Sequence, residues 1–140
     1  MITTKQQQMV FTVYWRRRST TSETFKRFIA MVKVVYPHAD STDVSLNIRG
    51  PQDTFTVNMN AGASDTMQFC KTGNHRYTAE VMRALIIMVE LNMAYNVDAD
   101  DNELWLEQLD HIASFVPITT YSKQREHFAE LLFADIERRN

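Results

Sequence analysis

The sequence is poor in cysteine and glycine, and each scarcity excludes a class of site. Cys70 is the only cysteine among 140 residues, so the chain cannot form an internal disulfide, and a thiolate zinc site would need several chains. Glycine occurs only at Gly50, Gly62 and Gly73, so the chain has no glycine-rich loop that could cradle a phosphate. We therefore expect neither a cofactor nor a metal.

Long apolar runs are also lacking. The longest, Ala84–Val89, is far shorter than the ~18 residues that a membrane span needs. Residues 1–8 have no apolar core of the kind that a signal peptide carries. We therefore expect a soluble, cytoplasmic protein without a membrane partner.

Charge is present but unevenly distributed. Residues 1–49 hold eight Lys or Arg against three Asp or Glu, whereas residues 50–140 hold seven against fourteen. The net charge of −2 excludes a protein that coats nucleic acid over its whole surface. A charge split of this kind speaks to the choice of partner and not to the fold.

Periodicity predicts a chain that begins with a strand and a helix, continues with three strands and ends with helices. Met9–Arg16 alternates with a period of two, which is typical of a strand and places Trp15 on the apolar face and Tyr14 on the other. Further strands are predicted at 43–49, 54–60 and 66–71, and helices at 21–36, 76–96, 102–115 and 121–138. In the last strand, Met67 and Phe69 are predicted to point inward.

These elements predict one α+β domain over residues 1–140, with a flexible N-terminus at 1–7. About four antiparallel strands pack on helices, and the C-terminal half is helical. The helix that begins near Tyr77 is apolar around much of its circumference, so we expect it either in the centre of the fold or covered by another chain.

The basic residues of the first half are the main candidates for a binding surface. An outward tyrosine and arginines on a strand can stack on and donate hydrogen bonds to a partner, although a plainly solvated sheet face is the alternative. The candidate residues are Tyr14, Arg16, Arg17, Arg18, Lys26, Arg27, Lys33, Asn47 and Arg49.

Three weaker patterns have simple structural alternatives. The acidic segment 96–103 fits a helix cap, with Asp100 as N-cap, better than a calcium loop, because Asp101 stands where a calcium loop needs glycine. Glu107 and His111 are spaced like two metal ligands but also like an ordinary helical pair. Cys70 lacks an oriented catalytic partner, so we expect a small buried side chain.

The order from residue 21 to 96 is helix, strand, strand, strand, helix. It resembles a double-stranded-RNA-binding domain, with Gly50-Pro51 before one strand and Gly73-Asn74-His75-Arg76 opening the second helix. The resemblance implies that Gly50 and Pro51 contact a minor groove and that His75 and Arg76 contact phosphates. The loop lacks the histidine that this family carries.

Three functions remain open. The first is a non-enzymatic interaction protein, a binding or inhibitory regulator that acts through a charge-polarised surface as a homo-oligomer. The second is an RNA- or DNA-binding module that uses Arg16–Arg18. The third is a small enzyme or ligand-binding oligomer with its site between subunits, which no motif in the chain supports.

Overall fold

The computed structural model describes residues 11–59 and 64–139, and it confirms one α+β domain with a helical C-terminal half. The expected flexible segment 1–7 lies outside the described residues. The elements in chain order are β1 (Thr12–Arg18), α2 (Ser22–Val35), β2 (Asp40–Ser41), β3 (Ser45–Ile48), β4 (Phe55–Asn58), β5 (Ser64–Lys71), α3 (His75–Glu90), β6 (Ala94–Ala99), α4 (Trp105–Ala113) and α5 (Tyr121–Arg139).

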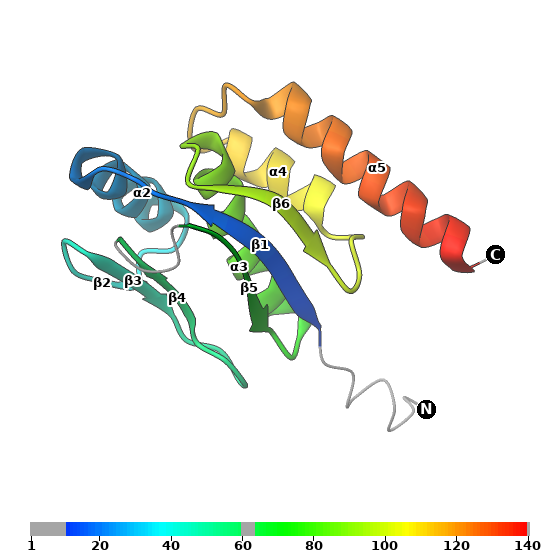
Figure 1. Cartoon of the computed structure of the whole chain (residues 1–140), viewed down its shortest axis with the longest axis horizontal. Helices are drawn as coiled ribbons and strands as arrows, with labels where there is room; N and C mark the ends of the chain where they lie inside the picture. The colour runs from blue at the N-terminus through cyan, green and yellow to red at the C-terminus, as the bar shows by residue number, and fades with distance from the viewer. Residues whose placement is uncertain (1–10, 60–63, 140) are drawn as a thin grey trace.

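The strands form two small antiparallel sheets instead of one. One sheet has the order β5–β1–β6 and the other the order β2–β3–β4. Figure 1 shows α3 behind β1 and β5, and α5 along the side of β6. The inner faces meet where Trp15 of β1 contacts Phe55 of β4, with ring centroids 5.2 Å apart.

Helix α3 lies in the centre of the fold, which is the first of the two expected outcomes. Nine of its residues are buried, among them Val81, Leu85 and Met88, and it packs on α2, α4, β1 and β6. Burial within this chain explains its broad apolar surface, so α3 gives no reason to expect a second chain.

The prediction that this helix continues to residue 96 is wrong. Helix α3 ends at Glu90, Asn92 takes a left-handed conformation with φ of 59°, and the chain returns as β6 beside β1. Asparagine tolerates this conformation better than most residues, which makes it a good helix stop. The apolar residues Met93, Ala94 and Val97 fit both the repeat of a helix and the repeat of a strand, so spacing alone did not reveal the strand.

The orientation of β5 is also corrected. Its register pairs Val13 with Cys70 and Tyr14 with Phe69, so Cys70 points inward and is buried. Met67 and Phe69 therefore point outward, contrary to the prediction. Because Val13 and Trp15 fix the inner face of β1, their cross-strand partners fix the face of β5.

The third correction concerns the start of α4. The helix begins at Trp105 without a side-chain cap, so Asp100 is not its N-cap. Asp100 instead accepts a hydrogen bond from the Tyr14 hydroxyl, and Asp101 Oδ1 accepts one from Glu103 N. Helix α2, by contrast, has a side-chain cap, since Thr21 Oγ1 accepts from Thr24 N at 3.1 Å.

No helix within the described residues is long and apolar enough to cross a membrane.

Candidate interaction surface

The sheet β5–β1–β6 has one buried face and one exposed face. Its inner face carries Val13, Trp15, Cys70 and Val97, all almost fully buried. We call the opposite side the outer face, and define it by Tyr14, Arg16 and Arg18 of β1, Met67 and Phe69 of β5, and Tyr95 and Asp98 of β6. Tyr14 lies between Phe69 and Asp98 in the register, and Arg16 lies between Met67 and Tyr95.

Apolar side chains on the outer face are exposed to solvent. Phe69 is 59% exposed and Met67 is 45% exposed, and they stand two residues apart on the same side of one strand. Single exposed apolar residues are normal, but a contiguous group beside aromatic rings is typical of a surface that another molecule covers. The outer face is the clearest such group on the strands.

The two ends of the outer face differ in charge. At one end the Arg18 guanidinium lies 4.2 Å from the centre of the Tyr95 ring, which places two cations, Arg16 and Arg18, beside an aromatic surface. At the other end, the Tyr14 hydroxyl donates to Asp100 Oδ1 at 3.0 Å, and Asp98 lies opposite Tyr14. Burial and the nearby Asp100 carboxylate raise the pKa of Tyr14, so its hydroxyl stays protonated at neutral pH.

The structure corrects the placement of Arg17. We expected it on the surface with its neighbours, but alternation sends it inward, where it is 1% exposed. Its Nη1 donates to Asn58 O at 3.2 Å, and burial lowers the pKa of the guanidinium. Arg17 therefore connects the two sheets and does not contribute to the outer face.

A second group of predicted residues lines one hollow. Arg49, Gly50, Pro51 and Arg76 surround a space of about 260 Å³ at the N-terminal end of α3. Each arginine also lies near a carboxylate, with Arg49 Nε 3.5 Å from Asp40 Oδ2 and Arg76 Nε 3.6 Å from Glu80 Oε1. These exposed pairs leave both arginines accessible.

Tyr77 holds the wall of this hollow in place. Its buried hydroxyl lies 2.7 Å from Ile48 O and 2.8 Å from Asp53 O, and it accepts from Phe55 N at 2.7 Å. A Cβ on Gly50 would lie 2.0 Å from Tyr77 Cε2, so only glycine allows the loop to pass this close to the ring. Burial raises the pKa of Tyr77 far above its usual range.

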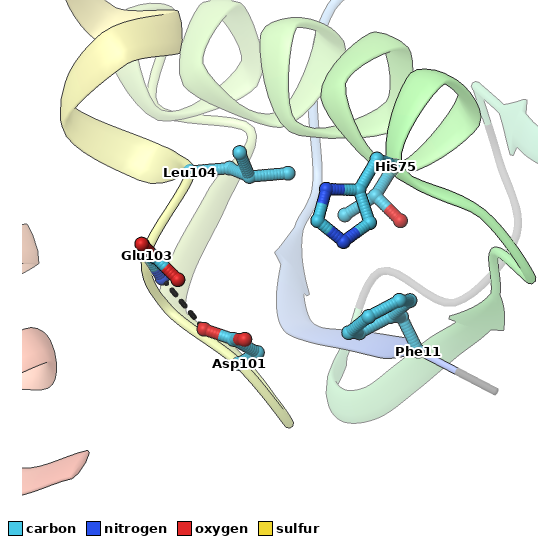
Figure 2. A pocket seen from close by; sticks show the side chains of 6 residues that line it. Phe11, His75, Asp101, Glu103 and Leu104 are labelled. Atoms are coloured by element: carbon cyan, nitrogen blue, oxygen red, sulfur yellow. Dashed lines mark hydrogen bonds between the residues drawn. The ribbon is translucent and has the colours of Figure 1, made fainter. Parts of the chain in front are cut away.

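His75 does not join Arg76 at the hollow. Figure 2 shows its ring beside Phe11, edge to face, with centroids 5.1 Å apart. The small pocket there, which Asp101, Glu103 and Leu104 also line, has a volume of about 10 Å³, space for about one water molecule. The structure therefore separates two residues that are adjacent in sequence.

The remaining candidates lie apart from both surfaces. Lys26, Arg27 and Lys33 are exposed on α2, and Arg27 lines a different hollow with Glu90 and Pro117. Asn47 lies on the other sheet, where its Oδ1 accepts from Thr56 Oγ1 at 2.8 Å. The basic residues between Arg16 and Arg49 thus spread over several surfaces instead of forming one patch.

The cysteine and the acidic patterns serve the structure. Burial raises the pKa of Cys70 to about 11, so the thiol is protonated and a poor nucleophile at neutral pH. Asn102 of the acidic segment donates through its backbone N–H to Asp135 Oδ2 at 3.0 Å and accepts from Trp105 Nε1 at 2.8 Å. The ring of His111 packs on Phe115, and within the described residues no group of three or more side chains is arranged to hold a metal.

Reasoning from the sequence missed Met67, Phe69 and Tyr95 as surface residues. The alternation of 66–71 gives two faces, and both carry residues that suit a core. The pairing of β5 with β1 decides which of the two faces is buried, and periodicity does not show this pairing. Comparison with protein-family models, with curated proteins and with solved structures found no match.

Proposed function

We propose that this chain is a non-enzymatic interaction protein that binds another protein through the outer face. The observation that carries the proposal is the exposure of Phe69 and Met67 beside Tyr14 and the two arginines on the outer face. Aromatic residues, methionine and arginine are the types enriched at protein interfaces, and buried aromatics and arginines contribute most of the binding energy there.

The outer face fits a protein better than it fits nucleic acid. Asp98 and Asp100 flank Tyr14, so a phosphate that approaches the ring meets two carboxylates. Arg17 faces inward, which leaves Arg16 and Arg18 as the cations on this strand. A protein partner can match apolar, cationic and anionic groups on one surface, whereas a phosphate backbone matches only the cations.

The test uses the double variant Met67→Ser/Phe69→Ser on an affinity column. Proteins retained by the wild-type chain are identified, purified and measured for direct binding, and we expect the variant to lose at least 10-fold in affinity, about 1.4 kcal/mol. The matched control is Val34→Ser/Val44→Ser, which removes two exposed apolar side chains from other elements. Equal binding by the double variant and the wild type would contradict the proposal.

A second candidate function is nucleic-acid binding at the hollow, because Arg49 and Arg76 line it together with Gly50-Pro51 at the start of α3. The resemblance to a double-stranded-RNA-binding domain implies contacts from three of these lining residues, Gly50, Pro51 and Arg76. In this chain β3 pairs with β4, whereas β5 pairs with β1, so the three strands between α2 and α3 that carry the resemblance do not form one sheet.

Duplex RNA binding at rising salt tests this candidate. If the hollow binds phosphates, Arg49→Ala/Arg76→Ala weakens binding and lowers the slope of log K against log salt by about 2. Lys26→Ala/Lys33→Ala, which removes the same charge from α2, leaves the slope unchanged. Binding that does not fall with salt, or that ignores the arginine pair, excludes the candidate.

A further inference from the structure

The partner that best complements the outer face is a second copy of this chain. We infer that two copies pack outer face to outer face about a two-fold axis that lies in the interface, perpendicular to the strands. The inference rests on the proposed function, since it names the occupant of the same surface.

The charges of the outer face favour this arrangement. Arg16 and Arg18 lie at one end of β1, and Asp98 and Asp100 lie beside Tyr14 towards the other end. An axis perpendicular to the strands turns β1 antiparallel to its counterpart, so the basic end of each copy faces the acidic end of the other. An axis parallel to the strands would set arginines against arginines, which costs free energy through like-charge repulsion.

The same axis brings the exposed apolar residues together. It places β5 over β5 of the second copy with reversed direction, so that Phe69 of one copy faces Met67 of the other. Sulfur–aromatic contacts of this kind are favourable, and both residues leave solvent. A single axis therefore matches the charged and the apolar parts of the surface.

The size of the face predicts a weak, reversible dimer. Seven residues of β1 at about 3.3 Å each and three strands about 4.8 Å apart span about 23 by 14 Å, a footprint of about 300 Å². A standard interface covers about 800 Å² on each partner. We therefore expect a dissociation constant on the order of 10–100 µM and not a permanent dimer.

Sedimentation velocity with two charge-swap variants tests the inference. Arg16→Glu/Arg18→Glu makes both ends of the face acidic, and Asp98→Asn/Asp100→Lys makes the acidic end basic, with asparagine keeping the acceptor that Ala99 N and Asn102 Nδ2 use. Lys26→Glu/Lys33→Glu is the matched control, since it makes the same charge change on α2.

The wild type and the control are expected to move from the 16.3 kDa of one chain towards about 33 kDa as concentration rises through about 100 µM. Each charge-swap variant alone stays a monomer, and an equimolar mixture of the two regains the larger mass. Salt of about 0.5 M weakens both the wild-type dimer and the mixture, because both depend on charge pairs across the interface. Circular dichroism checks that each variant is folded.

Two results would overturn the inference. One is a wild-type chain that remains a monomer to about 500 µM, several times the expected dissociation constant. The other is a dimer that both charge-swap variants form as readily as the wild type, which places the contact elsewhere. If the wild type is a monomer while the outer face still binds a different, purified protein, the proposed function stands and only this inference fails.

Discussion

The two sheets of this protein have similar inner faces and very different outer faces. On β2–β3–β4 the outward side chains are small and polar and bond to one another, as in Thr56 to Asn47 at 2.8 Å and the hydroxyls of Thr42 and Ser45 at 2.9 Å. On β5–β1–β6 the outward side chains are aromatic, apolar and cationic. The first surface has its hydrogen bonds met by its own neighbours, whereas the second leaves Phe69 in solvent.

This difference separates what folds the chain from what the chain does. Leu46, Ile48 and Phe55 on one inner face and Val13 and Trp15 on the other are buried to the same degree, so both sheets meet the same folding requirement. An outer face has no such requirement and can be polar at little cost. Exposed Met67 and Phe69 are therefore a feature that folding does not demand, which directs attention to binding.

The largest expected effect comes from breaking the contact between the inner faces. Phe55→Ala removes a fully buried ring that contacts Trp15 across the two sheets, and we expect the free energy of unfolding to fall by about 3–5 kcal/mol. Urea denaturation monitored by tryptophan fluorescence measures this loss. A loss below about 1 kcal/mol would show that the sheets do not depend on this contact.

Tyr77→Phe tests the polar link between α3 and the connection of β3 to β4. The variant keeps the ring but leaves Phe55 N, Ile48 O and Asp53 O without the hydroxyl, so we expect a loss of about 1–3 kcal/mol. Tyr121→Phe is the control, because its hydroxyl donates to Asp110 at the surface. Equal losses in the two variants would contradict the account of the buried hydroxyl.

Acid is expected to weaken the contacts at the two ends of α5. Burial raises the pKa of Asp135, but hydrogen bonds from Asn102 and Arg138 outweigh this effect, so the pKa of Asp135 is lower than usual. The pKa of Glu90 is also lower than usual, because hydrogen bonds from Thr119 and Thr120 outweigh its burial. A carboxyl group whose pKa is lower in the folded state stabilises the fold at pH values above its unfolded-state pKa. This stabilisation is lost as the pH falls through the folded-state pKa.

We therefore expect the free energy of unfolding to decline below about pH 4.5 and the decline to be shallower in Glu90→Gln/Asp135→Asn. Thermal unfolding across pH 3 to 7 measures both slopes. Identical slopes for the variant and the wild type would show that other carboxylates control acid stability.

The smallest effect on stability is expected on the outer face itself. Met67→Ser/Phe69→Ser removes side chains that are about half exposed, so the free energy of unfolding should change by no more than about 0.5 kcal/mol while protein binding is weakened at least 10-fold. Val34→Ser/Val44→Ser should change neither quantity. A large loss of stability would mean that the two residues serve the fold, and the comparison between the sheets would fail.

Local patterns predicted much of the fold, and pairing decided the rest. The spacing of Phe25, Phe28 and Val32 predicted α2, and the apolar circumference of α3 predicted its central position. Strand β6 and the outward face of β5 depend on which strands lie beside β1, and adjacent residues do not encode that choice. Arg17 looked like a surface residue by composition, yet its place in the alternation of β1 sends it into the core.

The candidate site was predictable only in part. Tyr14, Arg16 and Arg18 follow from alternation along β1, whereas Phe69 and Tyr95 join them through cross-strand pairing. The basic cluster looked continuous in sequence, but strand and helix geometry distributes it over separate surfaces. Counting charges therefore identifies the half of the chain that is rich in basic residues, but it does not identify the outer face.

Hydroxyl-radical footprinting tests the central claim most directly, because it compares exposed side chains within one sample. Phe133 on α5 is 67% exposed and serves as the internal reference for Met67 and Phe69. As the chain is concentrated through about 100 µM, oxidation of Met67 and Phe69 should slow while that of Phe133 stays constant. Protection of Phe133 with no change at Met67 and Phe69 would contradict the account and assign the interface to α5.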